Sequence, residues 1–271
     1  MSDRTSARAP FGRRLLSAIG VDELGAYRVL RVADDGPGAE PGQFAMLAAA
    51  EDWGGGEEQR PFLARAFSFA RQVRGEAHFL LEDVGPGTRR LCELDAGDGL
   101  WVVGPLGRGF SAPVAGRRAI LLGGGVGIAP LAILQDQLTA AATTVLLGFR
   151  DGARAEGAAL LDGARVASDD GSVGHHGRVT DLLAEELARD RNAIVYACGP
   201  AAMLESVRAM CAERDVPAQL ALEAGMACGF GACFGCVVAR RGGGYLRVCV
   251  DGPVLDAHEL ERVDEHAGAP V

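Results

Sequence analysis

Four cysteines in the last quarter of the chain are spaced in a way that suits iron–sulfur chemistry. Cys228, Cys233 and Cys236 fall within nine residues, and Cys249 follows after a strand-like segment. A C-x4-C-x2-C run with a distant fourth cysteine is the plant-type spacing for a [2Fe–2S] cluster. The glycines between the thiols permit the tight loop that three convergent ligands require. We therefore predict that these four cysteines hold a [2Fe–2S] cluster.

A structural zinc site is the main alternative for the same cysteines. Zinc ribbons carry paired C-x2-4-C knuckles at both ends of the site, whereas the second end here is the single Cys249. Unliganded thiols are a third interpretation. If the site moves single electrons, the preceding part of the chain must bind a group that donates or accepts them.

A glycine-rich turn supplies the second chemical signal. Residues 123–127 contain four glycines and lie between an apolar strand-like run and a helical pattern. Such a turn lets backbone amides at a helix N-terminus approach a pyrophosphate. A second strand-like run ends at residues 198–200, and ligands of open α/β sheets bind where strands end. The residues expected at this dinucleotide site are Gly123, Gly124, Gly125, Gly127, Cys198, Gly199 and Pro200.

The turn departs from the G-x-G-x-x-G fingerprint, because its sixth position is Ile128. A tight strand–helix turn without a ligand is therefore the alternative for the glycines. For Cys198 the alternative is a buried apolar thiol, which is common for cysteine.

Two different patterns along the chain predict the elements that position these sites. Up to about residue 114, short strand-like runs alternate with turn residues, which predicts an antiparallel barrel or sandwich. From residue 116, strands alternate with helices, which predicts βαβ units and a parallel sheet; residues 177–179 are among the strand-like runs. Beyond residue 219 the chain is rich in glycine and cysteine. The expected domains are 13–115, 116–218 and 219–271.

Composition limits the class of protein. The chain has 271 residues, which favours more than one domain, and 48% of them are hydrophobic, as in globular proteins. A net charge of −9 argues against a nucleic-acid partner. The apolar runs are shorter than a membrane span, and the first residues lack the apolar region of a secretory signal. We therefore expect a cytoplasmic protein whose cysteines serve metal or redox chemistry.

The order of the motifs resembles the ferredoxin–NADP reductase superfamily. The chain carries R-A-F-S at 65–68, G-P-G-T at 85–88, the glycine turn at 123–130 and C-G-P at 198–200. With the C-terminal cysteines included, the chain is similar to the electron transfer subunits of class 1B dihydroorotate dehydrogenase. The resemblance extends over roughly residues 20–260.

The resemblance implies a multidomain β plus α/β fold. An antiparallel Greek-key barrel would bind FAD, an α/β domain would bind NAD, and a small C-terminal domain would hold the [2Fe–2S] cluster. It also implies that Ser68, near flavin N5, and Cys198, near the nicotinamide, are the catalytic positions. The implied FAD contacts are Arg65, Ala66, Phe67, Ser68, Leu80, Leu81, Glu82, Gly87 and Thr88.

Three departures from the family pattern stand out. The family often has an Arg-Pro pair where this chain has Ala66 and Phe67, and often an arginine at the position of Glu82. It usually has an arginine at the position of Gly225, just before the cysteine loop.

The function implied by the resemblance is electron transfer. Electrons would pass from dihydroorotate to FMN on a catalytic partner subunit, then to [2Fe–2S], FAD and NAD. FAD is needed between the other two because a nicotinamide exchanges hydride while a cluster takes single electrons. The partner would be an FMN-containing dihydroorotate dehydrogenase catalytic subunit, with two copies of each subunit in a heterotetramer.

Two other functions remain open at this stage. An NAD(P)H-dependent FAD/[2Fe–2S] reductase could serve a different partner, such as an oxygenase or a sulfur-metabolising enzyme. A zinc-binding module attached to a nucleotide sensor would need no electron transfer. Arg150 and Arg154 also leave open whether the site accepts the 2′-phosphate of NADP.

Overall fold

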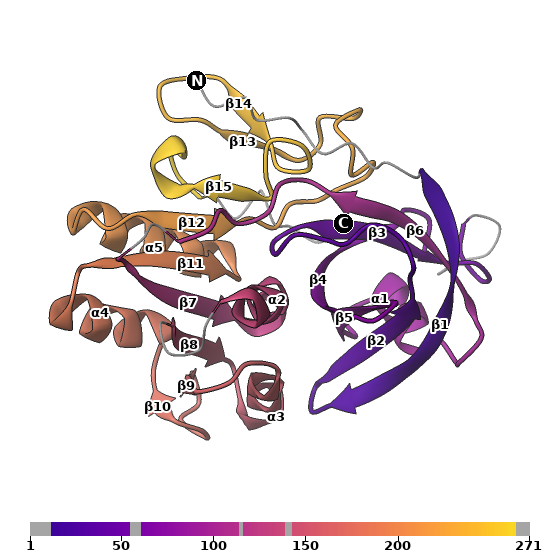
Figure 1. Cartoon of the computed structure of the whole chain (residues 1–271), viewed down its shortest axis with the longest axis horizontal. Helices are drawn as coiled ribbons and strands as arrows, with labels where there is room; N and C mark the ends of the chain where they lie inside the picture. The colour runs from indigo at the N-terminus through magenta and orange to yellow at the C-terminus, as the bar shows by residue number, and fades with distance from the viewer. Residues whose placement is uncertain (1–11, 55–60, 114–115, 139–142, 264–271) are drawn as a thin grey trace.

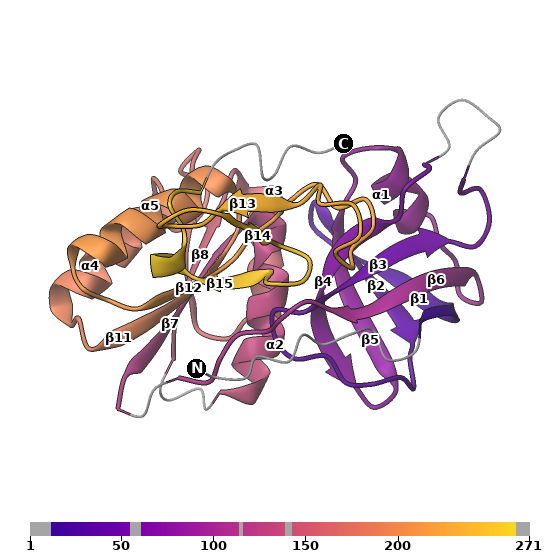
Figure 2. The ribbon, with the colours of Figure 1, turned by 90° about the horizontal axis from the view of Figure 1, so that it is seen from above.

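The chain folds into a barrel, a mixed sheet with helices, and a C-terminal segment that contacts both. The computed structural model describes residues 12–54, 61–113, 116–138 and 143–263. Figures 1 and 2 show the barrel beside the sheet, and the C-terminal segment on one side of the molecule. In the described part of the chain, no helix is both long and apolar enough to span a membrane.

The N-terminal part forms a closed antiparallel barrel. Its strands are β1 (Arg13–Leu24), β2 (Tyr27–Ala33), β3 (Phe44–Ala49), β4 (Arg65–Val73), β5 (Glu76–Glu82) and β6 (Gly99–Leu106). They pair in the order β1-β2-β5-β4-β3-β6. Alternate side chains point inward, and Phe69 and Phe79 meet inside with ring centroids 4.9 Å apart. A short helix, α1 (Pro86–Cys92), follows β5.

The second part is a seven-stranded sheet. Its strands are β7 (Arg118–Gly124), β8 (Thr143–Phe149), β9 (Ala164–Ser168), β10 (His175–His176), β11 (Ala193–Cys198), β12 (Ala218–Ala221) and β15 (Val254–Asp256). They pair in the order β10-β9-β8-β7-β11-β12-β15. All neighbours are parallel except β12 and β15, which are antiparallel. The strand order changes direction at β7, with β8 on one side and β11 on the other, which puts a ligand crevice at its carboxyl end.

Helices cover both faces of this sheet. The helical segments are η1 (Gly125–Ile128), α2 (Ala129–Gln137), α3 (Gly152–Ala155), η3 (Glu156–Leu160), α4 (Val179–Arg189), α5 (Ala201–Glu213) and η4 (Ala257–Glu259). Ile120 and Leu122 of β7 pack with α4 and α5, while Leu121 packs with α2. Helix α2, which begins with Pro130 in its first turn, also contacts β4 and so joins sheet and barrel (Figure 1).

The C-terminal part is built around a small hairpin. Strands β13 (Val237–Ala239) and β14 (Tyr245–Arg247) pair with each other, and β15 then returns to the main sheet. The expected boundary at residue 218 therefore falls at the first residue of β12, and the C-terminal part completes the sheet that precedes it.

The barrel and the α/β part confirm the predicted fold class, and one local element differs from expectation. Strand β1 lies in the expected barrel region, although its side chains are mostly exposed or half-buried and only Ala18 is fully buried. The strand-like run at 177–179 is not a strand: β10 ends at His176, and α4 begins at Val179.

Candidate functional site

The four cysteines predicted to bind the cluster lie together, as two pairs. The side chains of Cys228 and Cys233 hydrogen-bond to each other, and so do those of Cys236 and Cys249. A [2Fe–2S] cluster takes two protein ligands on each of its irons, so one pair matches each iron. Within residues 12–54, 61–113, 116–138 and 143–263, no three acidic, histidine or cysteine side chains converge on one metal-sized point.

Backbone amides surround these sulfurs. Although burial disfavours the Cys228 thiolate, hydrogen bonds from the amides of Cys233, Phe230 and Ala232 and from the Cys233 side chain lower its pKa to about 7. Burial, followed by the Cys236 thiol, raises the pKa of Cys249 to about 12, and the Gly231 amide opposes this. Amides that point at thiolate sulfur are the hydrogen bonds that tune iron–sulfur clusters. The residues therefore fit the cluster.

The cysteine loop packs directly on the barrel. A Cβ at Gly229 would lie 2.5 Å from Cγ of Met46, a residue of β3, and 3.3 Å from Leu106 of β6. Cys236 and Cys249 belong to the same apolar core as Met46. Because Met46 pairs with Ala66 across the sheet, the loop lies one strand away from the predicted flavin segment.

The predicted flavin phosphate residues also come together. A Cβ at Gly87 would lie 2.8 Å from Nε of Arg65, so the guanidinium of Arg65 passes over the first turn of α1. The Thr88 hydroxyl accepts hydrogen bonds from the amides of Val84 and Gly85, at 2.9 and 3.0 Å, and so shapes this turn. An arginine beside an open glycine turn suits a pyrophosphate.

Apolar side chains remain exposed around this turn. Phe62 is 74% exposed and Val84 is 71% exposed, and Ala66 on β4 is exposed as well. Phe67 and Ser68 are half-buried. A surface with a cation, open backbone and uncovered apolar groups fits a flavin dinucleotide.

The three expected contacts on β5 have different environments. Leu80 and Leu81 are buried in the apolar cores, so only their backbone is available to a ligand. Glu82 accepts a 2.7 Å ion pair from Arg154, and Arg154 also pairs with Asp151 at 2.6 Å. At this departure from the family pattern, the acidic side chain joins the barrel to the α/β part.

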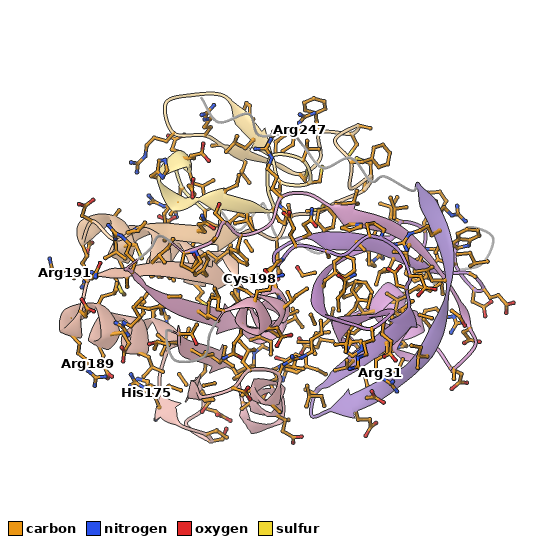
Figure 3. The ribbon with its side chains drawn as sticks, viewed as in Figure 1. Arg31, His175, Arg189, Arg191, Cys198 and Arg247 are labelled. Atoms are coloured by element: carbon orange, nitrogen blue, oxygen red, sulfur yellow. The ribbon has the colours of Figure 1, made fainter. Side chains whose placement is uncertain are left out.

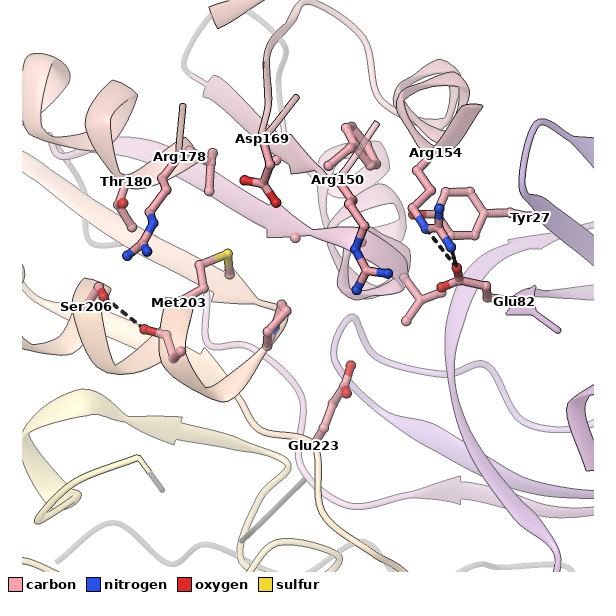
Figure 4. Close-up of a pocket in the computed structure, with 18 of the residues that line it drawn as sticks. Tyr27, Glu82, Arg150, Arg154, Asp169, Arg178, Thr180, Met203, Ser206 and Glu223 are labelled. Atoms are coloured by element: carbon pink, nitrogen blue, oxygen red, sulfur yellow. Dashed lines mark hydrogen bonds and ion pairs between the residues drawn. The ribbon is translucent and has the colours of Figure 1, made fainter. Parts of the chain in front are cut away.

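A cavity of about 470 Å³ opens between the barrel and the ends of the parallel strands (Figure 4). This volume is in the range of small-molecule sites. Tyr27, Glu82 and Val84 line it from the barrel. The lining on the other side comes from the carboxyl ends of β7, β8 and β9 and the first turns of α4 and α5. The cavity therefore lies at the edge of the sheet where the glycine turn predicted a dinucleotide.

The glycines of the turn serve two purposes. Gly124 and Gly125 line the cavity, and Gly125 has a φ of +57°, which favours glycine. A Cβ at Gly123 would lie 2.9 Å from Ile128, and one at Gly127 would lie 2.6 Å from the Cys198 carbonyl. These two glycines permit close packing inside the protein, and neither lines the cavity.

The second segment predicted at the dinucleotide site, residues 198–200, lies against the glycine turn. A Cβ at Gly199 would lie 3.0 Å from the Gly124 amide, and Pro200 lines the cavity. Cys198 is buried near the middle of the molecule (Figure 3), and burial followed by the charge of Glu223 raises its pKa. The Cys198 thiol therefore stays protonated.

Arg150 and Arg154, the arginines considered for a 2′-phosphate, line the cavity, but Glu223, Asp169 and Arg178 have no counterpart among the sequence predictions. The Glu223 residue is exposed overall, but its carboxyl group points into the cavity, where desolvation raises its pKa (Figure 4). Asp169, at the end of β9, projects into the cavity together with Arg150 and Arg178. No ion pair of Arg150 or Arg178 occurs in the described part of the chain. In the sequence, only the position of Asp169 directly after a strand could have indicated that it lies at the ligand-binding edge of the sheet.

Solved structures place this architecture in a class. A structure of an NADH-dependent reduced ferredoxin-NADP oxidoreductase, studied for flavin-based electron bifurcation, superposes with a TM-score of 0.76 and 27% identity over 92% of this chain and 90% of that one. A ferredoxin reductase in carbazole 1,9a-dioxygenase superposes with a TM-score of 0.64 and 23% identity over 75% of this chain and 66% of that one. The fold is that of the ferredoxin reductase class.

Sequence relatives identify the family within that class. Residues 223–261 match the model of the iron-sulfur cluster binding domain of dihydroorotate dehydrogenase B. One relative is the dihydroorotate dehydrogenase B (NAD(+)) electron transfer subunit of Desulforamulus reducens, which is 35% identical over 82% of this chain and 87% of its own length. The subunit of the same name from Bacillus caldolyticus is 40% identical over 82% of this chain and 86% of its own length. The chain belongs to the family of dihydroorotate dehydrogenase B electron transfer subunits, as its motifs predicted.

Proposed function

We propose that this chain carries electrons between NAD and an FMN-containing dihydroorotate dehydrogenase catalytic subunit, through a [2Fe–2S] cluster and FAD. The observation that carries the proposal is the packing of the paired cysteines on β3, one strand from the flavin segment, with the dinucleotide cavity on the adjoining sheet edge. When bound, FAD exchanges hydride with a nicotinamide and single electrons with a cluster.

Each part of the chain has its own task in this proposal. Residues 13–115 hold FAD, with Arg65 over the first turn of α1 and Ser68 beside the isoalloxazine. Residues 116–218 bind NAD at Gly124 and Gly125. Residues 219–271 hold the cluster through Cys228, Cys233, Cys236 and Cys249.

The chain's own groups set up the hydride-transfer end of the cavity. Cys198 remains a neutral thiol, because burial opposes its ionisation. Desolvation likewise favours the protonated form of Glu223. Arg150 and Arg178, which line the cavity, attract the phosphate-bearing end of the ligand.

The partner and the location belong to the same proposal. A heterotetramer with two copies of each subunit fits the family, and a reducing cytoplasm fits seven cysteines without a disulfide among those described. The test is to purify the complex anaerobically from the native cell and to identify its second chain. We expect an FMN protein that oxidises dihydroorotate. An oxygenase component or a sulfur-metabolising enzyme in its place would overturn the proposed partner.

A further inference from the structure

The hydroxyl of Tyr27 is a buried polar group that lacks a partner. The residue is 0% exposed, and within the described chain its hydroxyl oxygen makes no hydrogen bond. An unpaired buried hydroxyl destabilises a protein, and phenylalanine at the same position would avoid this. The hydroxyl nevertheless borders the cavity between barrel and sheet, where a bound molecule can supply the acceptor (Figure 4).

Three observations place the Tyr27 side chain. Its backbone is in register with Glu82 on β5, which fixes the start of β2. A Cβ at Gly157 would lie 2.8 Å from Cε2 of the ring, so the ring fits closely against η3. The hydroxyl oxygen is 3.9 Å from the Cβ position of Gly125 and therefore faces the glycine turn.

The charges around the hydroxyl favour an anionic acceptor. Burial, followed by the charge of Glu82, raises the pKa of Tyr27, so the hydroxyl stays a proton donor. Arg154 pairs with both Glu82 and Asp151, so its single positive charge offsets one of the two carboxylates. Arg150 also lines the cavity, and no ion pair of its guanidinium occurs in the described chain. A phosphate oxygen at this point would meet the guanidinium of Arg150, the open glycine turn and the hydroxyl of Tyr27 as a donor.

We propose that Tyr27 donates a hydrogen bond to the pyrophosphate of the nicotinamide dinucleotide bound at Gly124 and Gly125. A barrel residue would thus contact the ligand of the α/β part directly. The inference rests on the proposed function, because it assumes that NAD occupies this cavity. FAD also has a pyrophosphate, but Arg65 and Gly87, the contacts expected at its phosphates, do not line the cavity, whereas Glu82, another expected FAD contact, does.

The test compares Tyr27→Phe with the wild type in the complete chain loaded with FAD and cluster. Oxidised protein is titrated with NAD⁺ by calorimetry, and the flavin content and the thermal midpoint without NAD⁺ are recorded. We expect the Kd for NAD⁺ to rise about tenfold, the scale of a hydrogen bond to a charged group. FAD content should not change, and the midpoint without NAD⁺ should stay level or rise, because an unpaired hydroxyl is removed.

Tyr196→Phe is the matched control. Tyr196 is also fully buried, but its hydroxyl already donates to the Ser111 carbonyl at 3.1 Å. This variant should lose stability and keep its affinity for NAD⁺. An unchanged Kd for NAD⁺ in Tyr27→Phe overturns the proposal, and so does a loss of FAD with NAD⁺ affinity retained. Wild-type protein that fails to bind NAD⁺ would instead overturn the proposed function.

Discussion

Substitution of Gly229 by alanine tests whether the cysteine loop must lie against the barrel. Gly229 has a φ of +77°, where an alanine is strained by about 1–2 kcal/mol. Its new Cβ would lie 2.5 Å from Cγ and 2.8 Å from Sδ of Met46, and Cγ is not the free end of that side chain. Overpacking of this kind costs about 1–3 kcal/mol. We therefore expect Gly229→Ala to destabilise the docked loop by about 2–5 kcal/mol.

Gly242→Ala separates the two effects. Gly242 has a similar φ of +83°, but nothing lies within 4 Å of its Cβ position, so this variant should lose only about 1–2 kcal/mol. The assay is anaerobic denaturation followed by loss of cluster absorbance, together with stopped-flow reduction of the cluster by NADH. Gly229→Ala should be less stable than Gly242→Ala and should reduce its cluster more slowly. Equal behaviour of the two variants in both measurements would refute loop docking on Met46.

Three further substitutions test the separate sites. Cys233→Ser should lose iron and electron transfer to the partner while NADH still reduces FAD. The control Cys92→Ser should keep its iron. Iron that persists in Cys233→Ser would remove Cys233 from the ligand set. Arg65→Ala should weaken FAD binding by about 1.5–3 kcal/mol in a flavin titration. Arg31→Ala is the surface control. Unchanged affinity of Arg65→Ala for FAD would exclude Arg65 from the flavin site. Asp169→Asn should improve kcat/KM for NADPH relative to NADH by about tenfold. The reason is that Arg150 and Arg178 would then meet a 2′-phosphate without an opposing carboxylate. No change in the ratio would contradict a selective role for Asp169.

The sequence was informative where function depends on local spacing. The C-x4-C-x2-C run must form a tight loop wherever it lies, so the four cysteines could be assigned before their pairing was visible. Arg65 and Gly87 were likewise part of short motifs, and the structure brings them together. The barrel and the parallel sheet followed from turn residues and from the change in hydrophobic period.

Residues that act across the boundary between barrel and sheet could not be predicted in this way. Tyr27 belongs to a barrel strand and resembles an ordinary strand residue until the α/β part packs beside it, and the ion pair of Glu82 with Arg154 likewise forms only across this boundary. Glu223 precedes the cysteine loop, and the pairing of β12 with β11 places it at the cavity.

The electron path within this chain can be measured most directly by adding NADH to the anaerobically purified protein. Metal and flavin analysis should give two irons, two labile sulfides and one FAD per chain. NADH should then bleach the flavin and produce the paramagnetic signal of a reduced [2Fe–2S] cluster, without any partner present. Zinc in place of iron, or a reduced flavin beside an intact cluster that stays oxidised, would contradict electron transfer between NAD and the cysteine loop.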